Sequence, residues 1–436
     1  MRRLREDLPP PGDRGGMTPG RVSAARRAPL SGPAAALSAA LFAAGVCRAA
    51  DGVWSGVVPL SADGGRTSSG EGRTSCVLEF LGALDLPDDA PEGLSGVAWL
   101  GADDPPPDGV RPSGVIRGGS GDASPVGAFA FAEDSGGRVH FAGLGFDAAT
   151  GVPASCVFSA VRTVPGAVDL EGVAFDPASG SLWLSDECGP ALFRLSLREG
   201  TDPAPERRAD LLPPSLRRCR PNRSLEALGF DPVSRTLYTA SETAVEGDPD
   251  GVSRLVALLL PPEGKSVPRS EGKSVPRVRE WLVPLEPATG AALPMLPDPF
   301  TGLCGLAPLP DGRLLALERT FGYEFASGPD GEPVQSLCRF SISLLDPNGG
   351  TDPGGPPLDP SGRTDPGGPP VLEKRVLWRA LAGNANYEGI CLGPALPDGG
   401  RLVVLVSDGD VSRRRGLEMR WRKSLLFFRL CQSPSF

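Results

Sequence analysis

The sequence contains a single histidine, His140, among its 436 residues. A Ser-His-Asp hydrolase, a phosphatase with a histidine nucleophile and a His-ligated zinc site each need at least one well-placed histidine. His140 lies in the stretch RVHFAGLGF, which predicts a β-strand and favours an ordinary strand residue over a catalytic one. The shortage of histidine therefore argues against all three kinds of site.

Long apolar runs are also missing, and the net charge is negative. After residue 50 the chain has no apolar run approaching the roughly 18 residues that a membrane-spanning helix needs, so we expect no membrane span. The net charge of −9 disfavours nucleic acid as a partner, because phosphate backbones are bound by clustered Lys and Arg. The negative net charge is compatible with bound cations.

The nine cysteines show no CxxC spacing, so neither a zinc site nor a thioredoxin-type redox site is indicated. Disulfides and buried free thiols both stay open, because pairing cannot be deduced from sequence.

Residues 1–50 are typical of an N-terminal extension with an export signal. Three arginines precede a weakly apolar run, 34–46, and two alanines after it offer a small-residue cleavage site. The residues before Met17 are polar and Pro-rich, so Met17 is an alternative start. We expect an exported protein, periplasmic or extracellular, whose single domain spans residues 51–436.

Glycine (58) and proline (49) are abundant, which is typical of many short strands and turns. One unit recurs: a short apolar strand, a turn rich in Asp, Pro and Gly, and a second apolar strand. Its copies are 94–134 (with an insertion), 169–187, 224–242, 302–319 and 386–408. Most copies continue into a further strand, and we expect residues 76–86 to close the ring with C-terminal strands. The repeats predict an all-β fold, a β-propeller of about six blades with long Pro/Gly-rich insertions.

Two columns of mostly acidic residues emerge when the copies are aligned on their first strand. The column at the start of the first strand contains Ser95, Glu171, Glu226, Cys304 and Glu388. The column after the second strand contains Glu133 or Asp134, then Glu187 (preceded by Asp186), Glu242, Glu318 and Asp408. In an antiparallel hairpin the start of one strand lies beside the end of the next. Both columns are therefore expected at one mouth of the central channel.

Carboxylates that converge in a partly buried place must protonate, pair with arginine or bind a cation. Oxygen ligands without imidazole or thiolate suit Ca²⁺ or Mg²⁺, and Arg319 offers a counter-charge. In the structural alternative, each Glu bonds backbone N–H groups of a neighbouring strand. The residues alone leave both open.

Four motifs resemble the repeats of the phytase-like family with esterase-like activity: EGVAFDP…LWLSDE, LYTASE, LPDGRLLALER and NYEGICLGP…LPDGGRLVVLVSD. The resemblance runs from about Leu94 to Leu430. It implies a propeller that hydrolyses a phosphate ester, with Ca²⁺ as its cofactor, and we expect a monomer. Cys304 departs from the pattern, because the other well-matched copies have Glu there.

The resemblance, taken with the two columns, implies roles for the matching residues. The expected metal ligands are Asp186, Glu187, Glu242, Glu318 and Asp408. The expected ligands or general bases are Glu171, Glu226 and Glu388, with Arg319 as the electrostatic clamp. The metal would position the ester and lower the pKa of a water. Two other functions stay open: a non-catalytic propeller that binds a ligand or protein, and a gluconolactonase-like lactone hydrolase.

Overall fold

A computed structural model describes residues 58–60, 76–101, 126–147, 151–198, 204–261, 277–291, 298–327, 333–348, 368–414 and 417–432. All of these belong to one compact unit, Trp54–Phe436. The expected export signal and the alternative start at Met17 lie outside the described residues.

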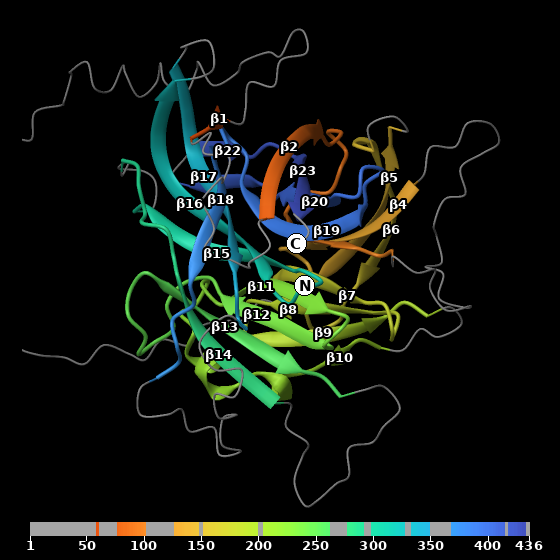
Figure 1. Cartoon of the computed structure of the whole chain (residues 1–436), viewed down its shortest axis with the longest axis vertical. Coiled ribbons are helices and arrows are strands. Elements are labelled where there is room, and N and C mark those ends of the chain that lie inside the picture. The colour runs from red at the N-terminus through yellow and green to blue at the C-terminus, as the bar shows by residue number, and fades with distance from the viewer. Residues whose placement is uncertain are drawn as a thin grey trace, which may run out of the picture. The chain divides into compact units, whose positions relative to one another are not determined.

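Five antiparallel sheets, here called blades, surround a common axis (Figure 1). Blade 1 contains β3 (Leu94–Trp99), β4 (Val126–Glu133), β5 (Arg138–Phe146) and β6 (Pro153–Thr163). Blade 2 contains β7 (Leu170–Asp176), β8 (Ser181–Asp186), β9 (Ala191–Ser196) and β10 (Glu206–Arg207). Blade 3 contains β11 (Leu225–Asp231), β12 (Thr236–Ser241), β13 (Val252–Leu259) and β14 (Arg277–Pro284).

The last two blades recruit strands from distant parts of the chain. Blade 4 contains β15 (Phe300–Pro308), β16 (Leu314–Ser327), β17 (Pro333–Leu345), β18 (Lys374–Leu381) and, at its edge, β1 (Val58–Pro59). Blade 5 contains β19 (Tyr387–Ala395), β20 (Arg401–Ser407), β23 (Ser424–Gln432) and β2 (Cys76–Asp85). The small hairpin of β21 (Val411–Arg414) and β22 (Leu417–Arg420) and the 3₁₀ turns η1 (Ala209–Leu211) and η2 (Pro214–Arg218) complete the described elements.

The ring is closed, which confirms the predicted all-β propeller. Each innermost strand contacts the next in the order β3, β7, β11, β15, β19, and β19 contacts β3. The described residues form five blades, however, rather than the expected six. The strand β2 does not begin a blade of its own but pairs with β23 from Cys76↔Gln432 to Asp85↔Ser424, as expected for the closing strand (Figure 1).

The hydrophobic core is divided into five clusters, one at each interface between neighbouring blades. Between blades 5 and 1, for example, Phe129 and Phe131 of β4 pack with Val404 of β20 and Phe427 of β23. Inner strands are buried on both faces because each blade lies between two others, and β8, β11 and β12 are accordingly buried at every residue. This packing holds the strand starts at fixed positions around the axis.

Every innermost strand carries a β-bulge near its start, where the pairing register shifts. A bulge leaves a residue outside the hydrogen-bond ladder and turns its side chain. Small residues beside the bulges let the inner strands approach closely. A Cβ at Gly96 would lie 2.6 Å from the carbonyl oxygen of Glu171, and one at Gly389 would lie 2.9 Å from that of Ser95.

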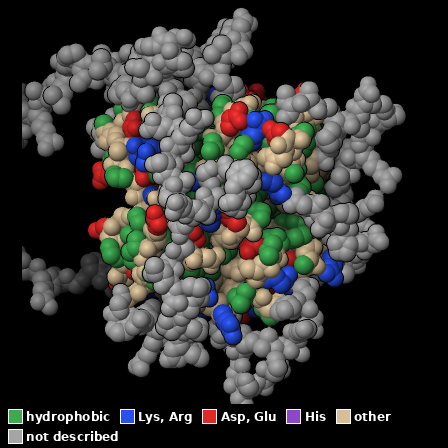
Figure 2. Space-filling model, in the orientation of Figure 1, with side chains coloured by type: hydrophobic (Ala, Val, Ile, Leu, Met, Phe, Trp, Pro, Cys, Tyr) green, Lys and Arg blue, Asp and Glu red, His purple; other side chains and the backbone are tan. Residues whose placement is uncertain are grey.

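The described surface mixes acidic, basic and apolar side chains, as Figure 2 shows for one face. The eight described cysteines are all free thiols. Within the described ranges, no helix has the length and apolar character needed to cross a membrane.

Candidate functional site

Two layers of side chains line one end of the axis, here called the channel mouth. The first layer comes from the five bulges: Ser95, Glu171, Glu226, Cys304 and Glu388. The second layer comes from the neighbouring strand of each blade, where each residue lies opposite the position two residues before the first-layer residue. Its members are Asp134, Glu187, Glu242, Arg319 and Asp408. The hairpin geometry therefore brings both predicted columns to one end, with a change in blade 4.

In blade 4 the second layer is occupied by Arg319, whereas the aligned column placed Glu318 there. Glu318 pairs with Leu303, and Arg319 pairs with Gly302. Arg319 therefore occupies the position that Glu187 and Glu242 occupy in blades 2 and 3. The strand β16 continues to Ser327, so no strand end marks the register in this blade. A shift of one residue turns a side chain to the opposite face of the sheet.

Glu318 is buried on that opposite face. Its carboxylate accepts hydrogen bonds from Lys374 Nζ at 2.9 and 3.0 Å and from the backbone N–H of Glu286 at 2.7 Å. Asp186 is similarly occupied, by the N–H groups of Val168 (3.0 Å) and Cys188 (2.9 Å). Neither carboxylate belongs to the groups of acids, among the described residues, whose oxygens are close enough to share a cation.

The position of Glu318 gives a direct test. Glu318→Gln is expected to lower the melting temperature equally in Ca²⁺ and in chelator, because this carboxylate does not face the channel mouth. Glu187→Gln, by contrast, should reduce the difference between the two conditions. Thermal unfolding of both variants measures this, and a loss of the Ca²⁺ response in Glu318→Gln would contradict the structural register.

Eight carboxylates lie around the mouth. Burial, reinforced by neighbouring carboxylates, raises the pKa of Glu171, Glu226 and Glu388 well above the ordinary range, although Arg319 opposes the rise at Glu226 and Glu388. The full set is Asp134, Asp169, Glu171, Glu187, Glu226, Glu242, Glu388 and Asp408.

Burial brings the pKa values of Glu187, Asp134 and Asp408, in the second layer, close to neutral pH. Burial raises the pKa of Glu187 to about 7, although the N–H of Ser224 donates to its carboxylate at 2.7 Å and lowers the pKa. Burial and Asp408 raise the pKa of Asp134 to about 7. Burial likewise raises the pKa of Asp408 to about 6, against a hydrogen bond from Asn386. Proton uptake at this mouth is therefore expected around neutral pH.

Arg319 is the central positive charge. Its Nη2 donates to Glu242 Oε1 at 2.7 Å, and its Nη1 donates to Glu388 and, at 3.2 Å, to Asn386 Oδ1. Burial opposes its charge, but Glu388 and Glu242 outweigh burial and raise its pKa. Its Nε–H is buried and has no acceptor among the described residues. Arg319 thus keeps its charge and retains one donor for a further ligand.

Cys304 fills the first-layer position of blade 4 with a neutral group. Its Sγ lies 3.4 Å from the carbonyl oxygen of Leu317 and 3.6 Å from that of Tyr387, and burial raises the pKa of the thiol well above its ordinary value. A Glu here would add a ninth carboxylate, whereas the thiol adds none. His140 lies away from the layers, in β5, where Nε2 contacts Glu133 at 2.5 Å.

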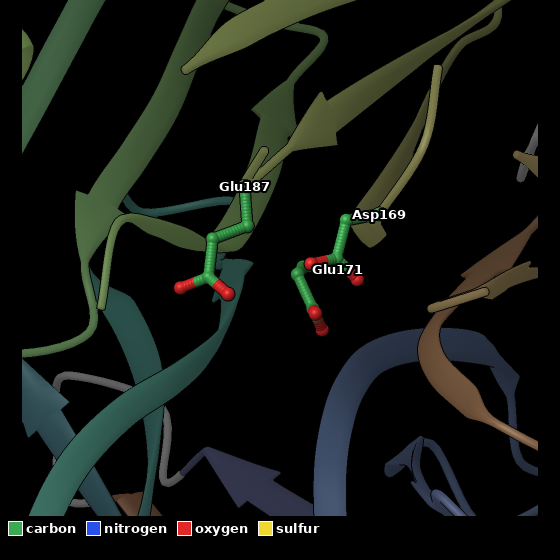
Figure 3. A group of neighbouring side chains, drawn as sticks. All are labelled: Asp169, Glu171 and Glu187. Carbon is green, nitrogen blue, oxygen red and sulfur yellow. The ribbon is translucent and has the colours of Figure 1, made fainter. Parts of the chain in front are cut away.

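Two overlapping groups of carboxylates have the spacing needed to hold a cation. The first contains Asp169, Glu171 and Glu187, and the second contains Glu187, Glu226 and Glu242; in each, the ligand oxygens lie within 4.8 Å of one another. Figure 3 shows the carboxyl groups of the first group facing a common space, with Asp169 and Glu171 close together and Glu187 across from them. Glu187 belongs to both groups.

The sequence matches the family described as "Esterase-like activity of phytase" over residues 117–411, more than half of the chain. The chain belongs to the phytase-like family. Membership fits a propeller hydrolase, and the family match covers both groups of carboxylates that could share a cation. No curated protein matched the sequence.

Solved structures resemble this phytase-like chain only distantly. Kuenenia stuttgartiensis hydrazine synthase is 12% identical with a TM-score of 0.29, and the match covers 79% of this chain and 66% of that one. Myxococcus xanthus glutaminyl cyclase is 12% identical with a TM-score of 0.31, covering 84% and 100%. A putative 6-phosphogluconolactonase from Bacteroides uniformis is 11% identical with a TM-score of 0.29, covering 69% and 84%. Scores this low carry no argument about this protein.

Three residues of this phytase-like site were missed by the sequence columns: Asp169, Arg223 and Asn386. Asp169 and Asn386 occupy equivalent positions, two residues before the Glu of the first layer. An alignment extended upstream of the strands would have found them. Arg223 gave no such signal, because its neighbour in space, Phe300, is far away in sequence; its guanidinium stacks 3.6 Å from that ring.

Proposed function

We propose that this chain is a phytase-like hydrolase that cleaves phosphate esters at the channel mouth, assisted by a divalent cation. The observation that carries the proposal is the pair of largely buried carboxylate groups sharing Glu187, next to the charged and largely buried Arg319. An acidic cluster supplies cation ligands, and the arginine supplies a partner for the anionic ester. Carboxylates alone would repel such a substrate.

Asp169, Glu171 and Glu187 fit a cation better than the second group does. In the second group Glu242 already accepts from Arg319 at 2.7 Å and from Arg223 at 2.6 Å, and a cation would have to compete with both arginines. All-oxygen carboxylate ligands suit Ca²⁺, with Mg²⁺ as the alternative. When bound, such an ion would act as a Lewis acid toward the phosphoryl group.

The chain's own residues would bind the ester and move the proton. Arg319 is held in place by Glu242 and Glu388, and its guanidinium supplies positive charge for a phosphoryl oxygen. A fixed guanidinium stabilises the negative charge that develops in phosphoryl transfer. Burial raises the pKa of Glu226 well above the ordinary range, so Glu226 can hold a proton near neutral pH and serve as general acid. Glu388, which pairs with Arg319, suits the role of general base.

The test is hydrolysis of phytate and of simple phosphate monoesters by the purified full chain, in Ca²⁺ and in chelator. Turnover in Ca²⁺ that is lost in chelator and restored by Ca²⁺ is expected. Arg208→Gln serves as a control, because Arg208 forms an exposed pair with Asp210 and belongs to neither layer of the mouth. Absence of phosphate release with every divalent cation tested would refute the proposal.

A non-catalytic binding propeller is the second candidate. It is favoured by hydrogen bonds in which the carboxylates of Glu187 and Asp186 accept from backbone N–H groups. Such bonds are expected of acids that connect neighbouring strands. This function predicts stabilisation by a ligand without turnover of any ester, so the same assay distinguishes the two.

A further inference from the structure

A cavity of about 230 Å³ lies at the outer part of blade 2. It is lined by Ser179, Ser181, Arg194, Ser196, Arg198 and Glu206. Neither the predicted columns nor the two layers at the mouth include any of these residues. The cavity is below the roughly 300–1,000 Å³ typical of pockets for drug-sized ligands, so its ligand is small.

This cavity is separate from the channel mouth. Ser181 is the first residue of β8, and Glu187 directly follows the last residue of that strand. Six strand residues at about 3.3 Å each span roughly 20 Å. A ligand in the cavity therefore cannot touch the carboxylate layers.

The lining is dominated by hydrogen-bond donors that the sheet holds in register. Ser181 of β8 pairs with Ser196 of β9, and Trp183 pairs with Arg194, whose guanidinium lies 5.9 Å from the indole ring. These pairs put the two hydroxyls and the guanidinium on one face of the sheet, because side chains alternate along a strand. Ser181 is itself buried.

The loops around the cavity are tied down as well. Arg198 Nε donates to the carbonyl oxygen of Ser179 at 2.9 Å, which holds the β7–β8 turn. Arg162, from blade 1, donates to the carbonyl oxygen of Ser196 at 3.3 Å. The Arg198 side chain and the backbone at Ser179 and Ser196 are thus held in place before a ligand arrives, which limits the entropy cost of binding.

The charges favour an anion. Two guanidinium groups and three hydroxyls face one carboxylate, that of Glu206, which pairs with Arg194 across β9 and β10. Guanidinium groups bind phosphate and similar oxyanions through charge-assisted hydrogen bonds. We propose that this cavity is a binding site for a small oxyanion, namely inorganic phosphate or a compact phosphate monoester, distinct from the channel mouth.

The experiment is isothermal titration calorimetry of the full chain with inorganic phosphate, in chelator so that no cation recruits phosphate to the mouth. One site per chain is expected. Arg194→Gln should weaken binding at least about tenfold, because a charge-assisted contact is lost. Ser181→Ala should weaken it several-fold. Arg207→Gln is the matched control, since Arg207 lies next to Glu206 on β10 but donates to the carbonyl oxygen of Gly189.

Circular dichroism of each variant checks folding, and Ser181→Ala removes only a hydroxyl, so it keeps the test informative if Arg194→Gln fails to fold. Displacement of phosphate by glycerol 2-phosphate at the same site would extend the ligand class to monoesters. Failure to bind phosphate at tens of millimolar would overturn the proposal. Binding that survives both cavity substitutions would overturn it too.

Discussion

Arg319→Met is expected to lower the free energy of unfolding by about 3–5 kcal/mol, the usual cost of removing one partner from a buried ion pair. Arg319 is the cation for Glu242, which is 0% exposed at its side chain, and for Glu388. Without the guanidinium, these carboxylates stay buried among others of the same sign. The protein must then protonate them or open the mouth, and both cost stability.

Urea unfolding at pH 7 measures this change, with Arg208→Met as the control for an exposed pair that is worth about 0–1 kcal/mol. The cost should shrink at pH 5, because the abandoned carboxyls take up protons. The double variant Arg319→Met/Glu388→Gln should recover part of the loss. An equal and small effect for Arg319→Met and Arg208→Met would show that Arg319 does not balance the mouth.

The second large effect concerns pH and cation together. In chelator, the protein is expected to lose stability as pH rises from about 4 toward 7. Glu187 and Asp134 have ordinary pKa values of 4.5 and 3.8 and folded values of about 7, so the folded state binds more protons across this window. Stability falls with pH wherever the folded state holds the extra protons. The contribution is complete below the ordinary pKa and lost above the folded one.

Ca²⁺ should reverse this loss, because it replaces the protons between the carboxylates. At 100 times its dissociation constant, an ion that binds only the folded state adds about 2.7 kcal/mol. The rise in melting temperature should be larger at pH 8 than at pH 5, and smaller in Glu171→Gln. Thermal unfolding across pH, in Ca²⁺ and in chelator, measures both. A melting temperature insensitive to Ca²⁺ at every pH would leave the acids with a structural role only.

The sequence was sufficient to predict the hairpin repeat and which of its ends carries the acids. Local spacing contains that information, since Glu187 follows Glu171 at the same interval as Glu242 follows Glu226. The alignment placed the wrong residue, Glu318, in the second column of blade 4, because β16 continues past Arg319 and no turn marks the register there. The bulges were also invisible to strand periodicity, although they turn the first-layer side chains toward the axis.

Neither the blade count nor the position of Arg223 could be predicted from the repeat pattern. Pairing of β2 with β23 joins segments from opposite ends of the chain, and no local signal says whether such a strand begins a blade or completes one. Arg223 reaches the mouth from a segment that precedes β11, and its place is set by packing on Phe300. Contacts of this kind depend on the assembled ring.

The pairing of β2 with β23 also constrains when the protein can fold. During synthesis, β2 emerges before blades 1 to 4 and must wait for β23, which follows all of them in the chain. Until then blade 5 lacks its outer strand, β2 presents an unpaired edge, and the apolar cluster shared by blades 4 and 5 is incomplete. Blades 1 to 4 can therefore form in sequence, but closure of the ring waits for β23 and brings together strands that are far apart in the chain.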